Sequence, residues 1–504
     1  MRGPFAIIPN GSALPRRDLP VLAKNPFFQT IVDVTGRGVR VASYFAVPEE
    51  AGNLLVCLLA GPDRQLGLMA TLVGDSIPSI ADTVPQVQLF EREIAEQWGI
   101  AVEGHPWLKP VRFHRSYRPG FDAWGRTELD PIEVGVMEYY RVEGQEIHEV
   151  AVGPVHAGII EPGHFRFQCQ GEKVHHLEIS LGYQHRGIER LLTGGPHART
   201  IHQLETVAGD TTIGHATAYC MLLEALADIE VPEQGAIIRA AALELERLAN
   251  HTGDLGALAG DVGFLPTQSF CGRIRGDFLN MTAELCGSRF GRGLIRPGGT
   301  GFDCETSRAD EIRRRLERAR HDLKEAADLL WESPSVMARF EGAGIVTSQL
   351  AREIGLVGPS ARASGLGIDV RSDYPAGYYR QQSLPVVTGI NGDVSDRAMV
   401  RWLEAEYSSC FIDDLLRRLP GDCCRLKTDP PASDMIAVSL VEGWRGEICH
   451  TAITDREGRF ACYKIVDPSF HNWFGLGLAL RGEQISDFPL CNKSFNLSYC
   501  GYDL

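Results

Sequence analysis

The chain has 504 residues, of which 44% are hydrophobic and 23% are charged. These are ordinary globular values, and a chain of this length exceeds a single compact core, so roughly two to four domains are expected. The formal net charge of -15 argues against a nucleic-acid-binding protein, because such proteins carry basic patches that neutralise phosphates.

Membrane and redox signals are weak along the whole sequence. The longest apolar stretch, residues 54–60, is far shorter than the ~20 residues of a membrane-spanning helix, and the N-terminus lacks the apolar segment of a secretion signal. We therefore expect a cytoplasmic protein that reaches a membrane only through partner subunits. The 13 cysteines include no CxxC pair, so most are expected to be small buried hydrophobic residues.

The N-terminal part of the chain predicts a small α/β domain over residues 1–110. β-rich runs at 39–47, 53–60 and 87–90 precede a short helical pattern at 91–100. Residues 111–145 are rich in turn-forming and aromatic residues and predict a linker. Strands are expected at 147–153, 164–170 and 174–181, the last two joined as a hairpin by a turn at 170–172.

The rest of the chain predicts a helical bundle followed by a β-meander. Apolar residues recur at helical spacing from Pro232 to Leu248, from Ile312 to Leu330 and over residues 400–419. Three alternating stretches at 435–443, 446–455 and 458–466 predict strands, with a turn at 455–458. The expected fold class is α+β: a small N-terminal α/β domain, a linker, and a large domain over 146–504, in which antiparallel β-hairpins flank the bundle.

Two polar clusters stand out near the predicted hairpin. Glu161 and His164, followed by Arg166, combine a carboxylate and an imidazole that could relay protons; the alternative is a polar β-turn. Arg186 could hold an anionic group, or it could pair with Glu189 one helical turn further on.

Three polar residues also interrupt the apolar helical pattern that follows residue 237. Asn250, His251 and Asp261 are either satisfied core groups or, if they face one cavity, part of a site. The sequence contains no phosphate-binding loop, dinucleotide-binding fingerprint or nucleophile elbow.

Several of these stretches together resemble a known family. They are EREIAEQWGIAVEGHP at 91–106, GPVHAG at 153–158, EPGHFRF at 161–167, GYQHRGIERL at 182–191, ELERLANHTGDLGALAGDVGF at 244–264, RPGGTGFD at 296–303 and GPSARASGLGIDVRSDYP at 358–375. In this order they are similar to a small peripheral subunit fused to the large subunit of complex I and of energy-converting NiFe hydrogenases of the formate hydrogenlyase type. The resemblance implies an oxidoreductase subunit.

The hydrogenase motifs of this family imply four thiolate ligands that this chain lacks. Where the family has ERxCGxCxxxH, the chain has ETVAGDTTIGH, so the cysteine positions fall on Ala208 and Thr211 while His215 matches. The C-terminal pair falls on Ser498 and Gly501, and Cys500 is one residue out of step. A nickel–iron centre needs soft sulfur ligands. We therefore expect a nickel-free, hydrogenase-like chain that binds no metal or cofactor itself.

The complex I side of the resemblance implies a quinone in the vacated cavity, but its residues are only partly kept. The family's quinone-site histidine falls on Pro162 and its tyrosine on Thr206, while its aspartate is matched to Asp261. Arg186 is expected to face the iron–sulfur cluster of a partner subunit, together with His215. A second histidine that approaches this cluster falls on Gly291.

Three functional hypotheses follow from the resemblance. In the first, the chain is a redox subunit, similar to NADH:quinone oxidoreductase, at the inner face of the membrane. It would pass electrons from an iron–sulfur small subunit to quinone or another small acceptor, and antiporter-like membrane subunits would translocate ions. Protons would come from Glu161, His164, Asp210 and Asp261. In the second, the chain is a structural and coupling scaffold with no substrate. The third, an active NiFe hydrogenase, is disfavoured by the missing thiolates.

Overall fold

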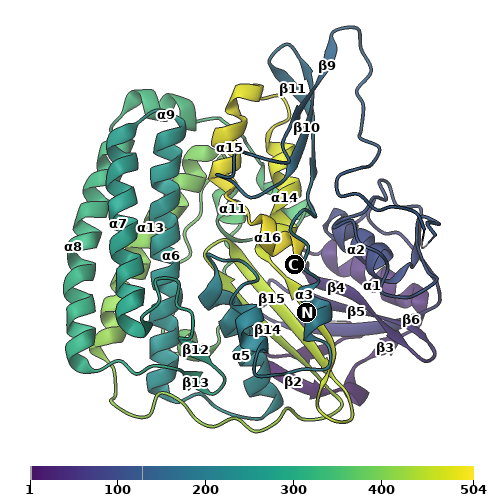
Figure 1. Ribbon diagram of the computed structural model, residues 1–504, viewed down its shortest axis with the longest axis horizontal. Coiled ribbons are helices and arrows are strands. Elements are labelled where there is room, and N and C mark those ends of the chain that lie inside the picture. Colours follow the sequence, from purple (N-terminus) through teal and green to yellow (C-terminus); the bar gives the residue numbers. More distant parts are fainter. Residues whose placement is uncertain (1–2, 128) are drawn as a thin grey trace.

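The computed structural model describes residues 3–127 and 129–504. Its N-terminal part is a five-stranded sheet with two helices packed on it (Figure 1). The sheet order is β1-β6-β5-β4, with β3 parallel to β6. The elements are β1 (Ala6–Ile8), β3 (Val21–Leu22), α1 (Lys24–Thr35), β4 (Arg40–Glu49), β5 (Gly52–Ala60), β6 (Leu66–Val73) and α2 (Gln88–Trp98). β5 is buried on both faces, which explains its unbroken apolar run.

The strand predicted at residues 87–90 is wrong, because these residues enter α2 through a short 3-10 turn. Val87, Phe90 and Ile94 are buried at helical spacing against the sheet. A four-residue apolar run does not distinguish a strand from a helix start. The helix lies between the short parallel strands β7 (Ser76–Pro78) and β8 (Ala101–Glu103).

The segment predicted as a linker contains no helix or strand among its described residues, 111–127 and 129–145. Its start is nevertheless firmly packed. Arg112 is buried, pairs with Glu93 of α2, and donates from Nε to the carbonyl oxygen of Tyr502, 2.8 Å away. The N-terminal sheet and the C-terminus of the chain are therefore joined through this segment.

The predicted hairpin after the linker and the predicted strand before it are both confirmed. β9 (Ile147–Val152), β10 (His164–Gln170) and β11 (Lys173–Ser180) form an antiparallel sheet in the order β11-β10-β9. The turn at 171–172 uses Gly171 at a φ of +56°, a conformation that glycine adopts readily. This sheet rises beside the C-terminal helices in Figure 1.

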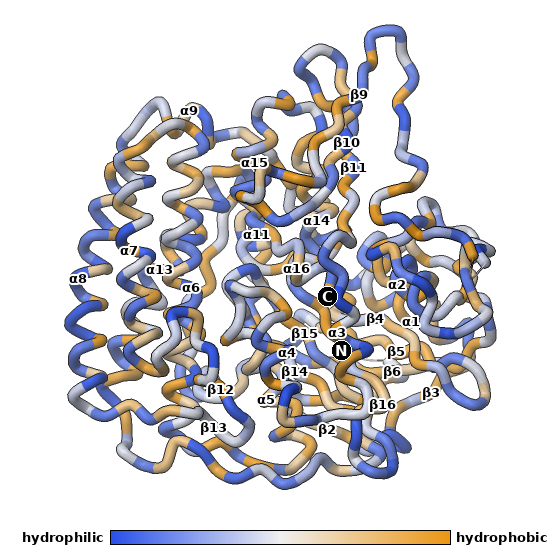
Figure 2. The backbone as a smooth tube through the Cα atoms, in the orientation of Figure 1, coloured by the Kyte–Doolittle hydropathy of each residue, from blue (hydrophilic) through white to orange (hydrophobic). Residues whose placement is uncertain are grey.

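The predicted helical bundle is also confirmed. Its four long helices run side by side in Figure 1: α6 (Glu233–Asp261), α7 (Leu265–Cys286), α8 (Thr306–Trp331) and α13 (Val394–Arg417). α8 is outermost and buries a stripe that includes Ile312, Leu316 and Leu323, while its other positions are hydrophilic (Figure 2). α6 is buried almost all round because α5 (Thr212–Leu226), α7 and α13 surround it.

The C-terminal meander forms as expected, which confirms the α+β fold class. β14 (Met435–Gly443), β15 (Gly446–Thr454) and β16 (Phe460–Val466) are successive antiparallel strands. A fourth strand was not predicted: β2 (Ser12–Pro15), from the start of the chain, pairs with β14. Its sequence, SALP, is too short to show an alternating pattern.

Shorter elements fill the space around the sheets and the bundle. They are β12 (Ile295–Arg296), β13 (Gly299–Thr300), α3 (Ile188–Leu192), α4 (Thr200–Leu204), α9 (Pro334–Phe340), α10 (Ser348–Glu353), α11 (Gly358–Ala363), α12 (Val370–Asp373), α14 (Pro468–Ala479), α15 (Phe488–Phe495) and α16 (Tyr499–Asp503). Among the described residues, no helix combines the length and the apolar character that a membrane crossing requires.

Candidate functional site

The two motifs that the sequence marks as a metal-site frame meet in the structure. We define the frame as residues 205–211, which precede α5, and residues 498–501, at the start of α16. The Arg186 guanidinium joins them: Nη1 donates to the Thr206 carbonyl oxygen at 2.6 Å, and Nη2 donates to the carbonyl oxygens of Val207 and Cys500 at 2.9 Å. Segments almost 300 residues apart in sequence are thus held together by one side chain.

The four expected ligand positions do not fit a nickel–iron centre. Ala208 and Gly501 offer no side-chain donor. The Thr211 hydroxyl receives a hydrogen bond from Trp444 Nε1 at 3.1 Å, and the Ser498 hydroxyl receives one from the Gly501 amide at 2.9 Å. Among the described residues, no group of three or more His, Cys, Asp or Glu side chains could hold a metal ion.

The loop half of the frame is bound to an arginine that sequence reasoning missed. Asp210 accepts hydrogen bonds from Arg445 Nη1 and Nη2 at 2.6 and 2.8 Å. Burial opposes ionisation, yet the guanidinium holds the pKa of Asp210 below its ordinary value. Arg445 is buried in the β14–β15 turn and donates from Nε to the Asn496 carbonyl oxygen. Its place in a turn between two predicted strands was the available signal.

Glu161 contacts the frame, whereas His164 contacts Arg166 of its own strand and the ring of Tyr139. A Glu161 oxygen accepts a hydrogen bond from the Tyr499 amide at 3.3 Å and also interacts with the Cys500 thiol. His164 begins β10, where its Nε2 receives a hydrogen bond from Arg166 Nε at 3.2 Å. Burial lowers the pKa of His164, which favours the neutral imidazole.

Asp261 is not brought to the frame. It is the last residue of α6 and is exposed. Asp254, two helical turns earlier, is buried, pairs with Arg401 Nε at 2.8 Å and receives a hydrogen bond from Asn496. Since Arg445 also binds Asn496, Asp254 is the α6 carboxylate connected to the frame. The expected role of Asp261 beside the other acids is not supported by this placement.

The α6 residues before Asp254 also face inward. Asn250 donates to the Asp210 carbonyl oxygen at 3.0 Å, so it belongs to the frame. His251 is fully buried, and its Nε2 lies 2.9 Å from Glu404 of α13. The expected polar face of this helix is thus shared between the frame and the bundle.

Arg186 is exposed at the edge of the frame, and the alternative pairing with Glu189 does not form. Glu189 instead accepts hydrogen bonds from Gln97 at 2.9 Å and from the Ile465 amide at 2.9 Å, and it pairs with Lys464 at 3.0 Å. The three carbonyl contacts leave the Arg186 charge unneutralised by any carboxylate among the described residues. Its predicted position opposite a partner's cluster stays a prediction.

His215 lies inside the protein rather than at this edge. It is fully buried, with Nε2 3.1 Å from Asp467 Oδ2 and Nδ1 3.1 Å from His450 Nε2. Both ring nitrogens are therefore occupied within the chain. Its burial separates His215 from Arg186, although the two were expected to face the same partner cluster.

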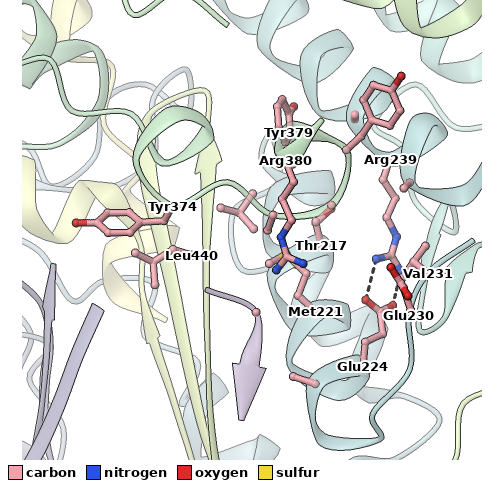
Figure 3. Close-up of a pocket in the computed structure, with 18 of the residues that line it drawn as sticks. Thr217, Met221, Glu224, Glu230, Val231, Arg239, Tyr374, Tyr379, Arg380 and Leu440 are labelled. Atoms are coloured by element: carbon pink, nitrogen blue, oxygen red, sulfur yellow. Dashed lines mark hydrogen bonds and ion pairs between the residues drawn. The ribbon is translucent and has the colours of Figure 1, made fainter. Parts of the chain in front are cut away.

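A large cavity lies away from the frame and was not predicted. It has a volume of about 1110 Å³ and is bounded by α5, α6, β14 and the 3-10 turn at Gly377–Arg380. Figure 3 shows Arg239 paired with Glu224 on one wall, with Met221, Tyr379 and Arg380 nearby. No residue of the frame lines this cavity.

A buried ionic network adjoins the cavity, because Tyr379, Arg371 and Glu442 line it. Tyr379 Oη donates to Glu244 at 2.6 Å, and Glu244 also binds Arg371. Arg362 then joins Glu404 and Glu442, each at 2.7 Å. The charged residues of this network are buried within the core of the protein.

Comparison with known proteins agrees with the motifs and the architecture. The family profile described as respiratory-chain NADH dehydrogenase, 49 Kd subunit, matches residues 261–436, and that of the 30 Kd subunit matches residues 22–120. The carbon monoxide-induced hydrogenase of Rhodospirillum rubrum is 31% identical over 350 residues, covering 69% of this chain and 97% of that protein. The chain belongs to the complex I and membrane-bound hydrogenase family.

Relatives from both branches of the family match. Formate hydrogenlyase subunit 5 of Escherichia coli (strain K12) is 30% identical over 439 residues, covering 84% of this chain and 76% of that protein. NADH-quinone oxidoreductase subunit 4 of Thermus thermophilus is 29% identical over 369 residues, covering 68% of this chain and 90% of that protein. The chain is thus a fused homologue of the 30 and 49 kDa subunits and a subunit-type component of an oxidoreductase complex.

Proposed function

We propose that this chain is a nickel-free redox subunit of a membrane-associated, complex I-related oxidoreductase. It receives electrons from an iron–sulfur cluster in a partner subunit and passes them to quinone or another small acceptor at the frame. Antiporter-like membrane subunits couple this transfer to ion translocation. The observation that carries the proposal is Arg186, whose exposed charge joins both halves of the frame. A cation there favours the reduced, more negative form of a neighbouring cluster.

Glu161 is the best placed residue to supply protons to an acceptor. It contacts the frame at Cys500 and the Tyr499 amide. Asp210 is a weaker donor because Arg445 stabilises its ionised form. His164, buried and bound to Arg166, is at most an indirect participant.

The scaffold function is the second candidate, and a specific observation favours it. Side chains of the protein itself occupy the space around the expected ligand positions. Asp467 Oδ2 lies 2.6 Å from the place of a Cβ on Gly501, and Arg445 binds Asp210 across the loop. A frame filled in this way could transmit conformational change without binding a substrate.

Quinone reduction by the assembled complex separates the two functions. The complex would be purified through a tag on this chain, and the parent compared with Glu161→Gln and the control Glu172→Gln, whose residue lies in the exposed β10–β11 turn. Loss of a positioned proton donor should lower turnover by about 100-fold, with the control unchanged. No turnover in the parent would favour the scaffold, whereas equal turnover in all three complexes would remove Glu161 as the proton donor.

A further inference from the structure

Four buried side chains form one continuous series of hydrogen bonds that begins next to the frame. Asp467 Oδ2 lies 3.1 Å from His215 Nε2, His215 Nδ1 lies 3.1 Å from His450 Nε2, and His450 Nδ1 lies 2.9 Å from the Tyr463 hydroxyl. All four side chains are at most 2% exposed. They come from β15, β16, α5 and the residue before α14. Asp467 is fixed because its Oδ1 caps α14 by accepting from the Ser469 amide at 2.8 Å.

With Asp467 ionised and both imidazoles neutral, these four side chains have one self-consistent arrangement of donors and acceptors. An ionised Asp467 accepts only, so His215 Nε2 donates to it. If both imidazoles are neutral, His450 Nε2 donates to His215 Nδ1 and the Tyr463 hydroxyl donates to His450 Nδ1. If His215 gains a proton, its Nδ1 donates to His450, whose own proton moves to Nδ1 and is donated to Tyr463. A proton held on His215 therefore reverses the two hydrogen bonds farther from Asp467.

The charges around these four side chains favour uptake of a single proton. Asp467 is the one ionised member, and burial is offset by His215 and Arg445, which keep its pKa low. Arg445 is itself paired with Asp210 and also faces Asp254. The other titratable groups that face these four side chains are neutral or weakly acidic. They are His471 beside Asp467, and Tyr219, Cys220 and Cys449 beside Tyr463. A proton on His215 would neutralise the remaining negative charge.

The hydrogen-bonded series comes close to the frame at Gly501. Asp467 Oδ2 and the Ser498 hydroxyl both lie within 3 Å of the place of a Cβ on Gly501, at 2.6 and 2.9 Å. The Ser498 hydroxyl is in turn 3.4 Å from the Cys500 thiol. The missing side chain of Gly501 thus leaves the Asp467 carboxylate of the buried series and the Ser498 hydroxyl of the frame close to the same point.

We propose that Asp467, His215, His450 and Tyr463 form a proton-uptake relay that holds one proton when negative charge arrives at the frame. The proton binds at the Asp467–His215 pair, and the change reaches Tyr463 as it turns from hydrogen-bond donor to acceptor. No covalent bond or electron is exchanged within the relay. Its link to electron arrival rests on the proposed redox function, whereas the proton uptake itself does not.

Nitrogen-15 NMR of the full-length chain labelled on histidine tests the relay without any electron donor. At high pH, His215 and His450 should both be neutral with protons on Nε2, and on acidification both should change together with one midpoint. Signals would be assigned from those lost in His450→Gln. A neutral His450 with its proton on Nδ1, independent titration of the two rings, or no protonation before acid unfolding would overturn the relay.

Matched variants separate the relay from ordinary packing. Asp467→Asn removes the anionic partner and should weaken proton binding at least about tenfold, seen as a lower midpoint. Tyr463→Phe should also lower the midpoint, because the hydroxyl that accepts from the protonated arrangement is gone. Tyr219→Phe removes a neighbouring hydroxyl, on a ring 6.3 Å from that of Tyr463, and should leave it unchanged. Equal midpoints in all variants would contradict the relay.

The assembled complex gives the second readout. The pH profile of acceptor reduction should shift in Tyr463→Phe and not in Tyr219→Phe, while KM for the acceptor stays the same. An inactive parent complex whose histidines titrate as expected would remove the proposed redox function and leave the proton uptake standing. Identical pH profiles for an active parent and Tyr463→Phe would remove the relay and leave the redox function.

Discussion

Asp210 and Arg445 form a two-pronged ion pair at the frame, with nitrogen–oxygen distances of 2.6 and 2.8 Å. The pair joins the loop before α5 to the β14–β15 turn, and Arg445 Nε extends the connection to Asn496. The carboxylate is 36% exposed and the guanidinium 5% exposed. The pair therefore ties three separate segments together where the family motif implies metal ligands.

Arg445→Met should destabilise the chain by about 2 kcal/mol, less than the cost of breaking a deeply buried pair because solvent reaches Asp210. Since the pKa of Asp210 is lowered in the folded state, the pair contributes stability above the unfolded pKa and loses it as pH falls through the folded one. Urea unfolding of parent and variant from pH 7 downward measures both effects. Arg459→Met, in an exposed pair with Asp455, is the control; equal losses in the two variants would contradict this account.

Metal analysis tests directly whether the frame binds nickel. Because Thr211 and Ser498 offer only hydroxyls that are already hydrogen bonded, the purified chain should contain no stoichiometric nickel. Elemental analysis of the chain isolated from cells grown with added nickel measures this, with a cysteine-containing NiFe hydrogenase prepared in parallel as the control. One nickel per chain would show that the ligand positions have been assigned to the wrong residues.

Arg186→Met should lower the midpoint potential of the partner's cluster by some tens of millivolts. A partly exposed cation near the cluster stabilises its reduced form by about 1 kcal/mol. The measurement is a redox titration of the assembled complex followed by EPR. Arg190→Met is the matched control, since Arg190 lies one turn further on and packs over Tyr117. An unmoved midpoint in a correctly assembled Arg186→Met complex would place the cluster elsewhere.

Glu246 gives the protein a distinct pH dependence. Its carboxylate accepts hydrogen bonds from the Ile213 and Gly214 amides, yet burial outweighs them and raises its pKa from 4.5 to about 8. The folded state thus binds this proton more tightly than the unfolded state. The stabilisation is complete below the unfolded pKa and is lost as pH rises through about 8.

The free energy of unfolding of Glu246→Gln should consequently fall less than that of the parent as pH rises from about 5 to about 8. Urea unfolding at intervals across this window measures the difference in slope. Glu325→Gln, at an exposed position on α8, should follow the parent. A Glu246→Gln slope identical to that of the parent would show that Glu246 is ionised in the folded protein.

Membrane attachment should be peripheral. In its native host the chain should sediment with membranes and be released by alkaline or chaotropic washes, because none of its described helices could span a bilayer and partner subunits would provide the contact. Fractionation followed by immunoblotting measures this, with an integral membrane protein as the retained control. A chain found only as a soluble monomer at native expression would contradict assembly into a membrane complex.

Local patterns predicted the parts of the fold that depend on neighbouring residues. The stripe from Ile312 to Leu330 and the alternation in β14–β16 each fall within one element, so the period alone was sufficient. The frame was found because its motif residues are contiguous. Asp261 was matched through the family resemblance, and the apolar spacing of α6 does not show that the helix has already reached the surface at this residue.

The buried polar partners could not be predicted in the same way. His215 meets Asp467 and His450 across sequence separations of 252 and 235 residues, and Arg445 meets Asp210 across 235. No local pattern specifies such pairs, since each residue alone resembles an ordinary core or turn residue. Tertiary packing decides which of many buried histidines and acids become neighbours.

The pairing of β2 with β14 affects how this protein must be made. Ser12 lies opposite Val438, so an edge of the C-terminal sheet is supplied by a segment that leaves the ribosome long before the rest of that sheet. That segment has to wait, with its backbone amides unpaired, until more than 400 further residues have been synthesised. If the gene were divided within the linker, the N-terminal product would carry a strand that belongs to the other half. The two products would then have to find each other before either sheet edge was sealed.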